Sequence, residues 1–282
     1  MEAEYIIKPQ TKQLLLSLAQ KYEIPAFTLE DPSQFLCWYS SPADIEPACF
    51  IAAMLSFGNR KQFIPKIKAI FQLADNEGGM ANWLKNGRYK KDFEQTDSCR
   101  DLNRKFYRFY SYSDMLDLFA ALGKLLQEHD TLGAAVHEFC GSRMSDNEAE
   151  IPAGARNSVA GTDSGSILDS TLDFFRIHFS YVSIVPKGKS SANKRIFMYL
   201  RWMVRQNSPV DLGLWSWFPQ EELIIPLDVH VLQEAKKLEL IPSTAPASFK
   251  TAQLLTTRLK QIWPDDPCKG DFALFGLGVD EV

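Results

Sequence analysis

The stretch that decides the fold runs from Val182 to Val231 and reads VSIVPKGKSSANKRIFMYLRWMVRQNSPVDLGLWSWFPQEELIIPLDVHV. A basic loop leads into an amphipathic segment that carries Lys194 near its start, and a Trp-rich connection then leads to Pro226 and Asp228. An aspartate at this place after a proline predicts the N-terminus of a helix. A lysine and an aspartate therefore each lie near the start of a predicted helix, and a compact connection joins them. This arrangement is suited to catalysis.

Most of the chain outside this stretch also predicts helices. Apolar residues recur at helical spacing, whereas strand signals are few and short. Asp31 and Ser113 are predicted N-caps. The segments predicted as helices are 9–22, 32–39, 44–57, 60–74, 115–129, 132–140, 168–179, 194–206, 228–240, 248–263 and 271–278. We therefore expect an all-α, multi-helical fold packed in layers. In the segment 194–206 we expect the side chains of Arg195, Arg201 and Arg205 to point outward.

The length of 282 residues allows one large domain or two small ones. We expect a single helical unit over residues 1–282, with residues 141–165 as the candidate boundary between two subdomains. That segment has no apolar periodicity, which predicts a mobile loop. No apolar run reaches the roughly 20 residues that span a bilayer, and the N-terminus lacks a signal sequence. We therefore expect a cytoplasmic protein with no membrane partner.

Charge and cysteines narrow the class of protein. The five cysteines are scattered and never spaced C-x-x-C, so we expect no disulfide framework and no metal site. The net charge is −4, yet residues 174–210 contain seven bases and no acid. A local basic region on an acidic chain fits a protein that presents one face to a polyanion. An exposed helix face with no partner is the alternative.

Three motifs carry a resemblance to a known family. They are Asn193-Lys194-Arg195-Ile196-Phe197, Ile225-Pro226-Leu227-Asp228-Val229-His230-Val231 and Asp271-Phe272-Ala273-Leu274-Phe275-Gly276-Leu277-Gly278. Together they resemble the helix-hairpin-helix superfamily of DNA glycosylases, most of all its archaeal 8-oxoguanine branch. The predicted helical hairpin at 44–70 resembles the early hairpin of that superfamily. The whole chain is also similar to an uncharacterised bacterial family related to this branch. Residues 185–189, VPKGK, replace the usual Leu-Pro-Gly-Val-Gly type of turn.

The resemblance implies a glycosylase-like fold and a DNA glycosylase with associated lyase activity. Lys194 would attack the anomeric carbon and form a Schiff base, and Asp228 would stabilise the positive charge on the sugar. Burial or a cationic neighbour lowers the pKa of a lysine toward the state that can attack. The implied partner is double-stranded DNA with a damaged base, for which oxidised purine is the favoured lesion. We expect a monomer with no metal or organic cofactor.

Further residues are expected around this pair. The predicted DNA-binding residues are Lys187, Gly188, Lys189, Ser190, Ser191, Arg195 and His230. By analogy with the superfamily, the predicted base pocket contains Ser56, Phe57 and Asn59. A second nucleic-acid contact is conceivable where Arg104, Lys105 and Arg108 alternate with Phe106, Tyr107 and Phe109; a solvated face over core aromatic residues is the alternative.

Three simpler interpretations remain open. Lys194 is also explained as a solvated side chain, Asp228 as a purely structural N-cap, and His230 as a packing residue. Two rival functions follow from them. One is a nucleic-acid-binding protein on the same fold without catalysis. The other is a helical interaction protein with no nucleic-acid role.

Overall fold

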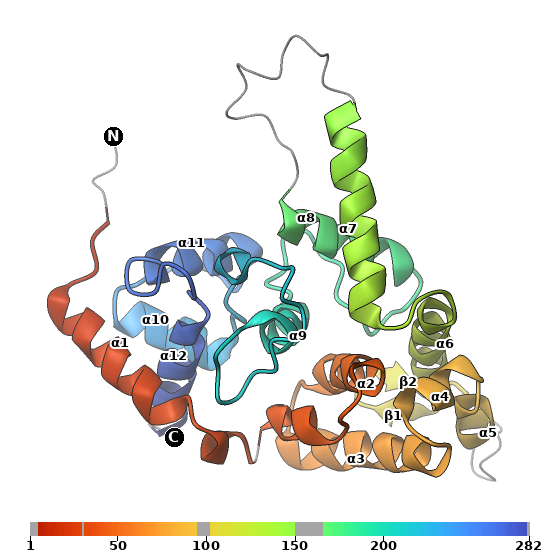
Figure 1. Cartoon of the computed structure of the whole chain (residues 1–282). Coiled ribbons are helices and arrows are strands. Elements are labelled where there is room, and N and C mark those ends of the chain that lie inside the picture. The colour runs from red at the N-terminus through yellow and green to blue at the C-terminus, as the bar shows by residue number, and fades with distance from the viewer. Residues whose placement is uncertain (1–4, 30, 95–101, 150–165, 281–282) are drawn as a thin grey trace. The chain divides into compact units, whose positions relative to one another are not determined.

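The structure is a computed structural model that describes residues 5–29, 31–94, 102–149 and 166–280 (Figure 1). Helices dominate these residues, and one pair of short strands accompanies them. The expected all-α class is therefore confirmed. Within the described ranges, no helix has both the length and the apolar character needed to cross a membrane.

The chain forms two compact units. Unit 1 comprises Met1–Trp38, Cys49–Ile64 and Pro186–Val282, and unit 2 comprises Tyr39–Ala48 and Pro65–Val185. Of the segment 141–165, residues up to Ala149 continue a helix instead of forming the expected loop, and residues 150–165 lie outside the described ranges. The helices on either side of that gap both belong to unit 2.

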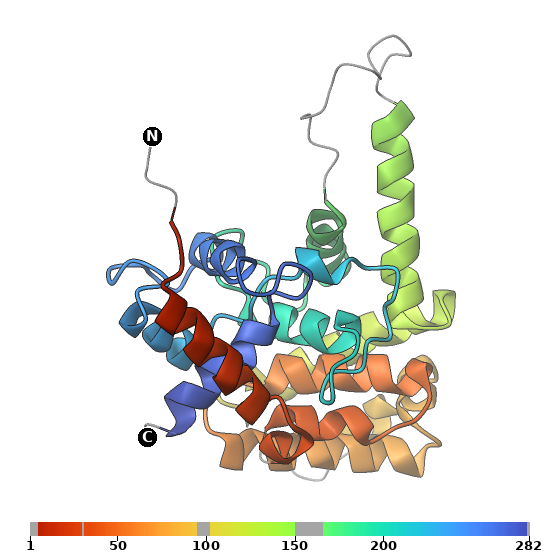
Figure 2. The same cartoon turned by 60° about the vertical axis from the view of Figure 1, so that its left-hand side comes forward.

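Unit 1 is built around its last helix, α12. Its helices and 3₁₀ turns are α1 (Pro9–Tyr22), η1 (Pro25–Thr28), η2 (Pro32–Cys37), α9 (Lys194–Val204), η3 (Gln220–Glu222), α10 (Val229–Lys237), α11 (Phe249–Leu259) and α12 (Lys269–Asp280). Helix α12 packs against α1 and α10, and Figure 2 shows this packing from a second side. The approach is close because α12 contains glycines. A Cβ at Gly276 would lie 2.2 Å from the ring of Tyr22, and one at Gly278 would lie 3.0 Å from Cβ of His230.

Helix α9 is buried over almost its whole length. Every residue from Ile196 to Val204 is buried, and the Tyr199 ring packs edge-on against Phe50 with centroids 5.1 Å apart. The expectation that Arg201 and Arg205 point outward is therefore wrong. Arg201 is 7% exposed and Arg205 is 1% exposed.

The two buried arginines are neutralised by carboxylates from distant parts of unit 1. Arg201 contacts Asp271 and Asp211, and Arg205 is ion-paired with three acids: Glu23 at 2.7 Å, Asp211 at 2.6 Å and Asp266 at 2.7 Å. Buried cations require such partners, since burial without them is costly. The positive charge of the basic segment found in the sequence is therefore partly neutralised by acids that contact these two arginines in the structure.

Unit 2 contains the remaining elements. They are α4 (Met80–Lys85), α5 (Tyr89–Glu94), β1 (Lys105–Tyr107), β2 (Tyr110–Ser111), α6 (Tyr112–Glu128), α7 (Leu132–Ala149) and α8 (Ile167–His178). The helices α2 (Pro42–Leu55) and α3 (Arg60–Asn76) contribute residues to both units. Trp83 and Phe119 centre the core of unit 2, with ring centroids 4.8 Å apart.

Local signals set several helix starts. The predicted N-cap Asp31 is confirmed, because its side chain accepts a hydrogen bond from the Ser33 N–H, although the turn that follows is a 3₁₀ helix. The predicted cap at Ser113 is wrong by two residues. Ser111 caps α6 instead, and it forms a reciprocal capping box with Asp114.

Candidate functional site

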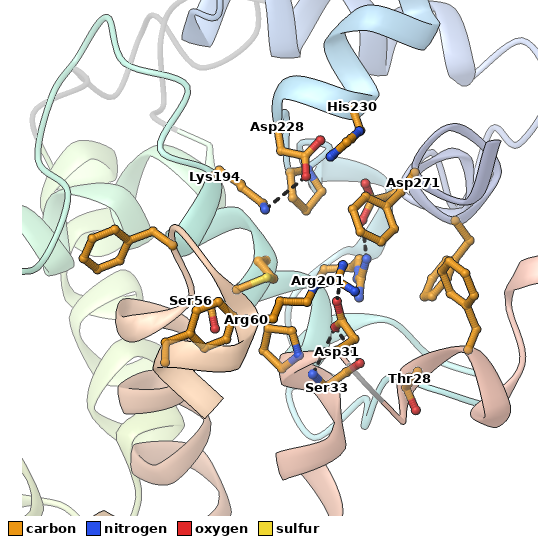
Figure 3. Close-up of a pocket in the computed structure, with 18 of the residues that line it drawn as sticks. Thr28, Asp31, Ser33, Ser56, Arg60, Lys194, Arg201, Asp228, His230 and Asp271 are labelled. Carbon is orange, nitrogen blue, oxygen red and sulfur yellow. Dashed lines mark hydrogen bonds and ion pairs between the residues drawn. The ribbon is translucent and has the colours of Figure 1, made fainter. Parts of the chain in front are cut away.

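The lysine and the aspartate singled out in the sequence meet in unit 1. Lys194 is the first residue of α9 and Asp228 is the N-cap of α10. The Nζ of Lys194 lies 3.1 Å from Oδ2 of Asp228 (Figure 3). The other carboxylate oxygen, Oδ1, accepts a hydrogen bond of 2.8 Å from the Val231 N–H. The structural role of Asp228 as a cap and its contact with Lys194 therefore exist together.

A short ordered loop positions Lys194. Asn193, which precedes it, adopts a left-handed conformation with φ of 46°, and its Nδ2 donates a hydrogen bond of 2.8 Å to the Gly188 carbonyl. The Phe249 N–H donates to the Ser190 carbonyl at 3.0 Å. The loop before the lysine is thus fastened both to itself and to the start of α11, which limits the places that the amine can reach.

The apolar run before Asp228 positions the carboxylate. Residues 223–227 are all buried, and the Ile225 N–H donates a hydrogen bond to Oγ1 of Thr256 at 3.1 Å. The Asp228 side chain is 12% exposed and the Lys194 side chain is 36% exposed. The pair therefore stands at the boundary between the interior of unit 1 and solvent.

An inner cavity of about 190 Å³ lies beside the pair. An engineered apolar cavity of about 150 Å³ holds benzene, so this volume suits an aromatic ring system. Both charged and aromatic side chains line it. The charged ones are Asp31, Arg60, Lys194, Arg201, Asp228 and Asp271, and the aromatic ones are Phe27, Phe57, Phe63, Phe272 and Phe275. All of them belong to unit 1.

A second, outer hollow of about 540 Å³ adjoins the inner cavity. Six residues line both spaces: Ser56, Phe57, Gly58, Lys194, Asp228 and His230. Since the two hollows share Lys194 and Asp228, the pair lies where the outer hollow meets the inner cavity. A ligand that enters from the outer hollow would pass the amine and the carboxylate first.

Asp271 is a second carboxyl group in the inner cavity, and sequence reasoning did not select it as a site residue. It lies in the first turn of α12 and is 6% exposed. Burial raises the pKa of Asp271 to about 6; the Arg201 guanidinium opposes this rise, and the charge of Asp228 adds to it. The Arg201 Nη1 donates a hydrogen bond to the Asp271 carboxylate, as Figure 3 shows. A carboxyl with this pKa can give or take a proton near neutral pH.

Arg60 and Asp31 line the opposite part of the cavity. Arg60 Nη2 lies 3.5 Å from Asp31 Oδ2, and the Arg60 guanidinium lies 5.4 Å from the centre of the Phe275 ring. Sequence reasoning missed this pair as well. The only signal was the position of Arg60 at the start of α3, directly after the turn that was predicted to line the pocket.

The predicted base-pocket residues divide into two groups. Ser56 and Phe57 line both hollows. Asn59 is not among the lining residues of either one. Its Oδ1 accepts a hydrogen bond of 2.9 Å from the Lys61 N–H, so Asn59 is exposed and helps to start α3.

The predicted DNA-binding residues divide similarly. His230 lines both hollows, and Ser191 and Arg195 line the outer one. Lys187, Gly188, Lys189 and Ser190 are not among the lining residues of either. Arg195 Nη1 donates to the Met54 carbonyl at 2.5 Å, and its guanidinium lies 5.0 Å from the centre of the Phe57 ring. Arg195 thus fastens the turn that carries Phe57.

The described part of the chain contains no group of three or more His, Cys, Asp or Glu side chains arranged to hold a metal ion. The functional groups of the site are therefore an amine, three carboxyls, two guanidinium groups and one imidazole. Such a set can carry out nucleophilic attack and proton transfer.

Comparison with known proteins identifies a family. The chain belongs to the family described as "Protein of unknown function (DUF2400)", whose model matches residues 31–280. The match includes the Lys194–Asp228 pair, Asp271 and Arg60. Neither the curated proteins nor the solved structures contain a match to this chain.

Proposed function

We propose that the protein is a DNA glycosylase with associated lyase activity that removes a damaged base through a Schiff base on Lys194. The observation that carries the proposal is the 3.1 Å contact between Lys194 Nζ and Asp228 Oδ2 at the mouth of an aromatic-lined cavity. The helix-hairpin-helix resemblance of the motifs around these residues supports it. Oxidised purine is the substrate that this resemblance favours.

Lys194 and Asp228 have different roles in the proposed reaction. The neutral amine of Lys194 attacks C1′ of the nucleotide, a C–N bond forms, and the glycosidic bond breaks with its electron pair leaving on the base. The carboxylate of Asp228 stabilises the positive charge that develops on the sugar and accepts the proton that the amine releases. The product of this displacement is an aminal; its C1′–O4′ bond then breaks, O4′ takes the proton held by Asp228, and the nitrogen lone pair forms the C=N bond of the Schiff base. Loss of a proton from C2′ then expels the 3′ phosphate, which is the lyase step.

The departing base needs a proton, and Asp271 is placed to supply it. This carboxyl lines the inner cavity with a pKa near 6, so a fraction of it is protonated at neutral pH. After the transfer, the Asp271 carboxylate is stabilised by the Arg201 guanidinium that already contacts it. Two carboxyls with different roles are a recurring arrangement in enzymes that cleave glycosidic bonds.

The shape of the site also supports an extruded base. Enzymes that act on a base in duplex DNA move it out of the stack into a pocket. The outer hollow would hold the sugar and phosphate, and the inner cavity would hold the base against the rings of Phe57 and Phe275.

A trapping experiment tests the proposal. The protein is incubated with duplexes that carry 8-oxoguanine, other single lesions or an abasic site, and sodium borohydride then reduces any Schiff base to a stable covalent bond. We expect a covalent complex with wild type, none with Lys194→Gln, and strongly reduced base release with Asp228→Asn. Lys260→Gln is the matched control, because Lys260 is an exposed lysine of the same unit away from both hollows.

A non-catalytic nucleic-acid-binding protein is the second candidate. One observation favours it: both oxygens of Asp228 already have partners, one in Lys194 and one in the Val231 N–H. The pair is then a structural link between α9 and α10. Duplex binding that persists without trapping on any lesion or abasic site would establish this candidate and reject the glycosylase.

A further inference from the structure

The hairpin formed by β1 and β2 in unit 2 ends in an exposed aromatic residue. Tyr107 and Tyr110 are paired across the hairpin, so its turn consists of Arg108 and Phe109 (Figure 1). Phe106 and Tyr107 are buried in unit 2, whereas Phe109 is 68% exposed. Of the three aromatic residues noted in the sequence, Phe106 and Tyr107 therefore belong to the core of unit 2, and Phe109 faces solvent.

The backbone of this turn is unusual. Arg108 has φ of 48°, which lies in the left-handed region that hairpin turns usually fill with Gly or Asn. A side chain there is strained, because its Cβ crowds the following carbonyl oxygen. Because both turn residues are exposed, burial of a side chain does not explain this conformation. Strain of this kind is characteristic of functional positions.

Three exposed basic side chains belong to this hairpin and the residue before it. The Arg108 guanidinium lies 5.3 Å from the centre of the Phe109 ring, and the Lys105 Nζ donates a hydrogen bond of 2.7 Å to the Phe109 carbonyl. Arg104 stacks on Tyr112, 5.1 Å from the ring centre, and donates to its hydroxyl at 3.1 Å. Arg104, Lys105 and Arg108 are all exposed. The hairpin region thus carries three exposed cations: Arg108 lies against the Phe109 ring, Lys105 contacts the Phe109 backbone, and Arg104 lies against Tyr112.

The charge of Lys105 acts on Asp114, which lies in the first turn of α6. Asp114 is half-buried and caps α6, where it accepts hydrogen bonds from Ser111 and from Ser183. Ser183 lies three residues before Pro186, where the basic loop begins. Its hydrogen bond to Asp114 therefore links the segment that leads into the basic loop to α6, the helix that follows the hairpin.

We propose that the β1–β2 hairpin binds double-stranded DNA, with Arg104, Lys105 and Arg108 on the phosphates and the Phe109 ring inserted between bases. Phosphate contacts by arginine and lysine supply affinity and orientation, and an apolar side chain that enters a base step unstacks it. The inference rests on the proposed function for the identity of the polyanion. It adds a DNA contact in unit 2 to the site proposed in unit 1.

Fluorescence measurements on the full-length protein test the inference. An undamaged duplex with a 2-aminopurine reports unstacking as a rise in emission, and a labelled duplex reports affinity by anisotropy at several salt concentrations. We expect wild type to unstack the duplex and Phe109→Ala to bind about 5- to 100-fold more weakly without the rise in emission. Phe109→Trp should restore both signals. The double variant Arg104→Gln with Lys105→Gln should lower the slope of log affinity against log salt by about two.

Controls separate this inference from the glycosylase proposal. Ile177→Ala removes another exposed apolar side chain of unit 2 and should change neither signal. Unfolding temperatures check that Phe109→Ala folds, which its exposure predicts. Unchanged affinity and emission in Phe109→Ala would overturn the hairpin proposal alone, as would a wild type that binds no duplex at low salt. A wild type that binds and unstacks DNA but is never trapped by borohydride would overturn the glycosylase and leave the hairpin in place.

Discussion

The Lys194 amine and the Asp228 carboxylate lie 3.1 Å apart although 34 positions separate them in the chain, and each occupies the first turn or the cap of a different helix. The contact is between a partly exposed cation and a largely buried anion. The geometry fixes the amine beside a carboxylate at the junction of two hollows. Predictions about activity and stability follow from this site and from the packing that supports it.

Substitution of Asp228 should separate its two roles. Asp228→Ser retains a side chain that caps α10, so we expect a free energy of unfolding within about 0.5 kcal/mol of wild type. Asp228→Ala removes the cap and should cost about 1 kcal/mol. Both variants should lose base release, because neither has a carboxylate. Urea unfolding and single-turnover assays check these outcomes, and full activity in Asp228→Ser would contradict the catalytic role.

Asp271 should make stability depend on pH. Its folded-state pKa of about 6 exceeds the ordinary value of 3.8, because burial disfavours the charged form. The stabilising contribution of its protonated form is therefore complete below about pH 4 and is lost as the pH rises through 6. Between about pH 4 and a pH well above 6, the free energy of unfolding should fall by about 3 kcal/mol because of this group.

Asp271→Asn provides the measurement. The variant does not titrate at this position, so the difference in free energy of unfolding between it and wild type should vary between pH 4 and pH 7. Asp265→Asn, at an exposed position of the same unit, is the control for the chemical change from carboxyl to amide. A difference that stays constant with pH for Asp271→Asn would show that this carboxyl titrates normally.

Among the charged residues of unit 1, Arg205 should be the one whose substitution lowers the free energy of unfolding most. Arg205→Met leaves Glu23, Asp211 and Asp266 without their shared cation, and loss of one partner from a buried ion pair costs about 3–5 kcal/mol. Lys8→Ala breaks an ion pair with Glu239 whose side chains are 69% and 71% exposed, and it should cost much less than Arg205→Met because solvent screens an exposed pair. Equal costs in urea unfolding would contradict the buried network.

Two glycine substitutions should act in opposite directions. Gly276→Ala places a methyl group 2.2 Å from the Tyr22 ring and should destabilise unit 1 by several kcal/mol, since α1 and α12 must separate. Gly141→Ala lies in helix α7 with no atom within 4 Å of the new methyl group, and it should stabilise the protein by about 0.5–1 kcal/mol. Thermal unfolding compares the two, and a stable Gly276→Ala would argue against the close α1–α12 packing.

Periodicity and caps predicted much of the helical content. The first helix was expected at 9–22 and is found at Pro9–Tyr22, and Lys194 was expected near the start of its helix and begins it. The hairpin β1–β2 was not predicted, because strands of three and two residues are too short to show an alternating pattern. The extension of α7 to Ala149 was missed because that end has no apolar stripe.

The sequence by itself determined the all-α class, the N-cap at Asp228 and the position of Lys194 at the start of a helix, because caps and helical spacing act over a few neighbouring residues. Only the tertiary structure decided the surroundings of the pair. It buried Arg201 and Arg205 among acids up to 182 positions away, and it placed Asp271 and Arg60 in the same cavity. Burial and ion pairing depend on which distant segments pack together, and the pKa of a carboxyl follows from that packing.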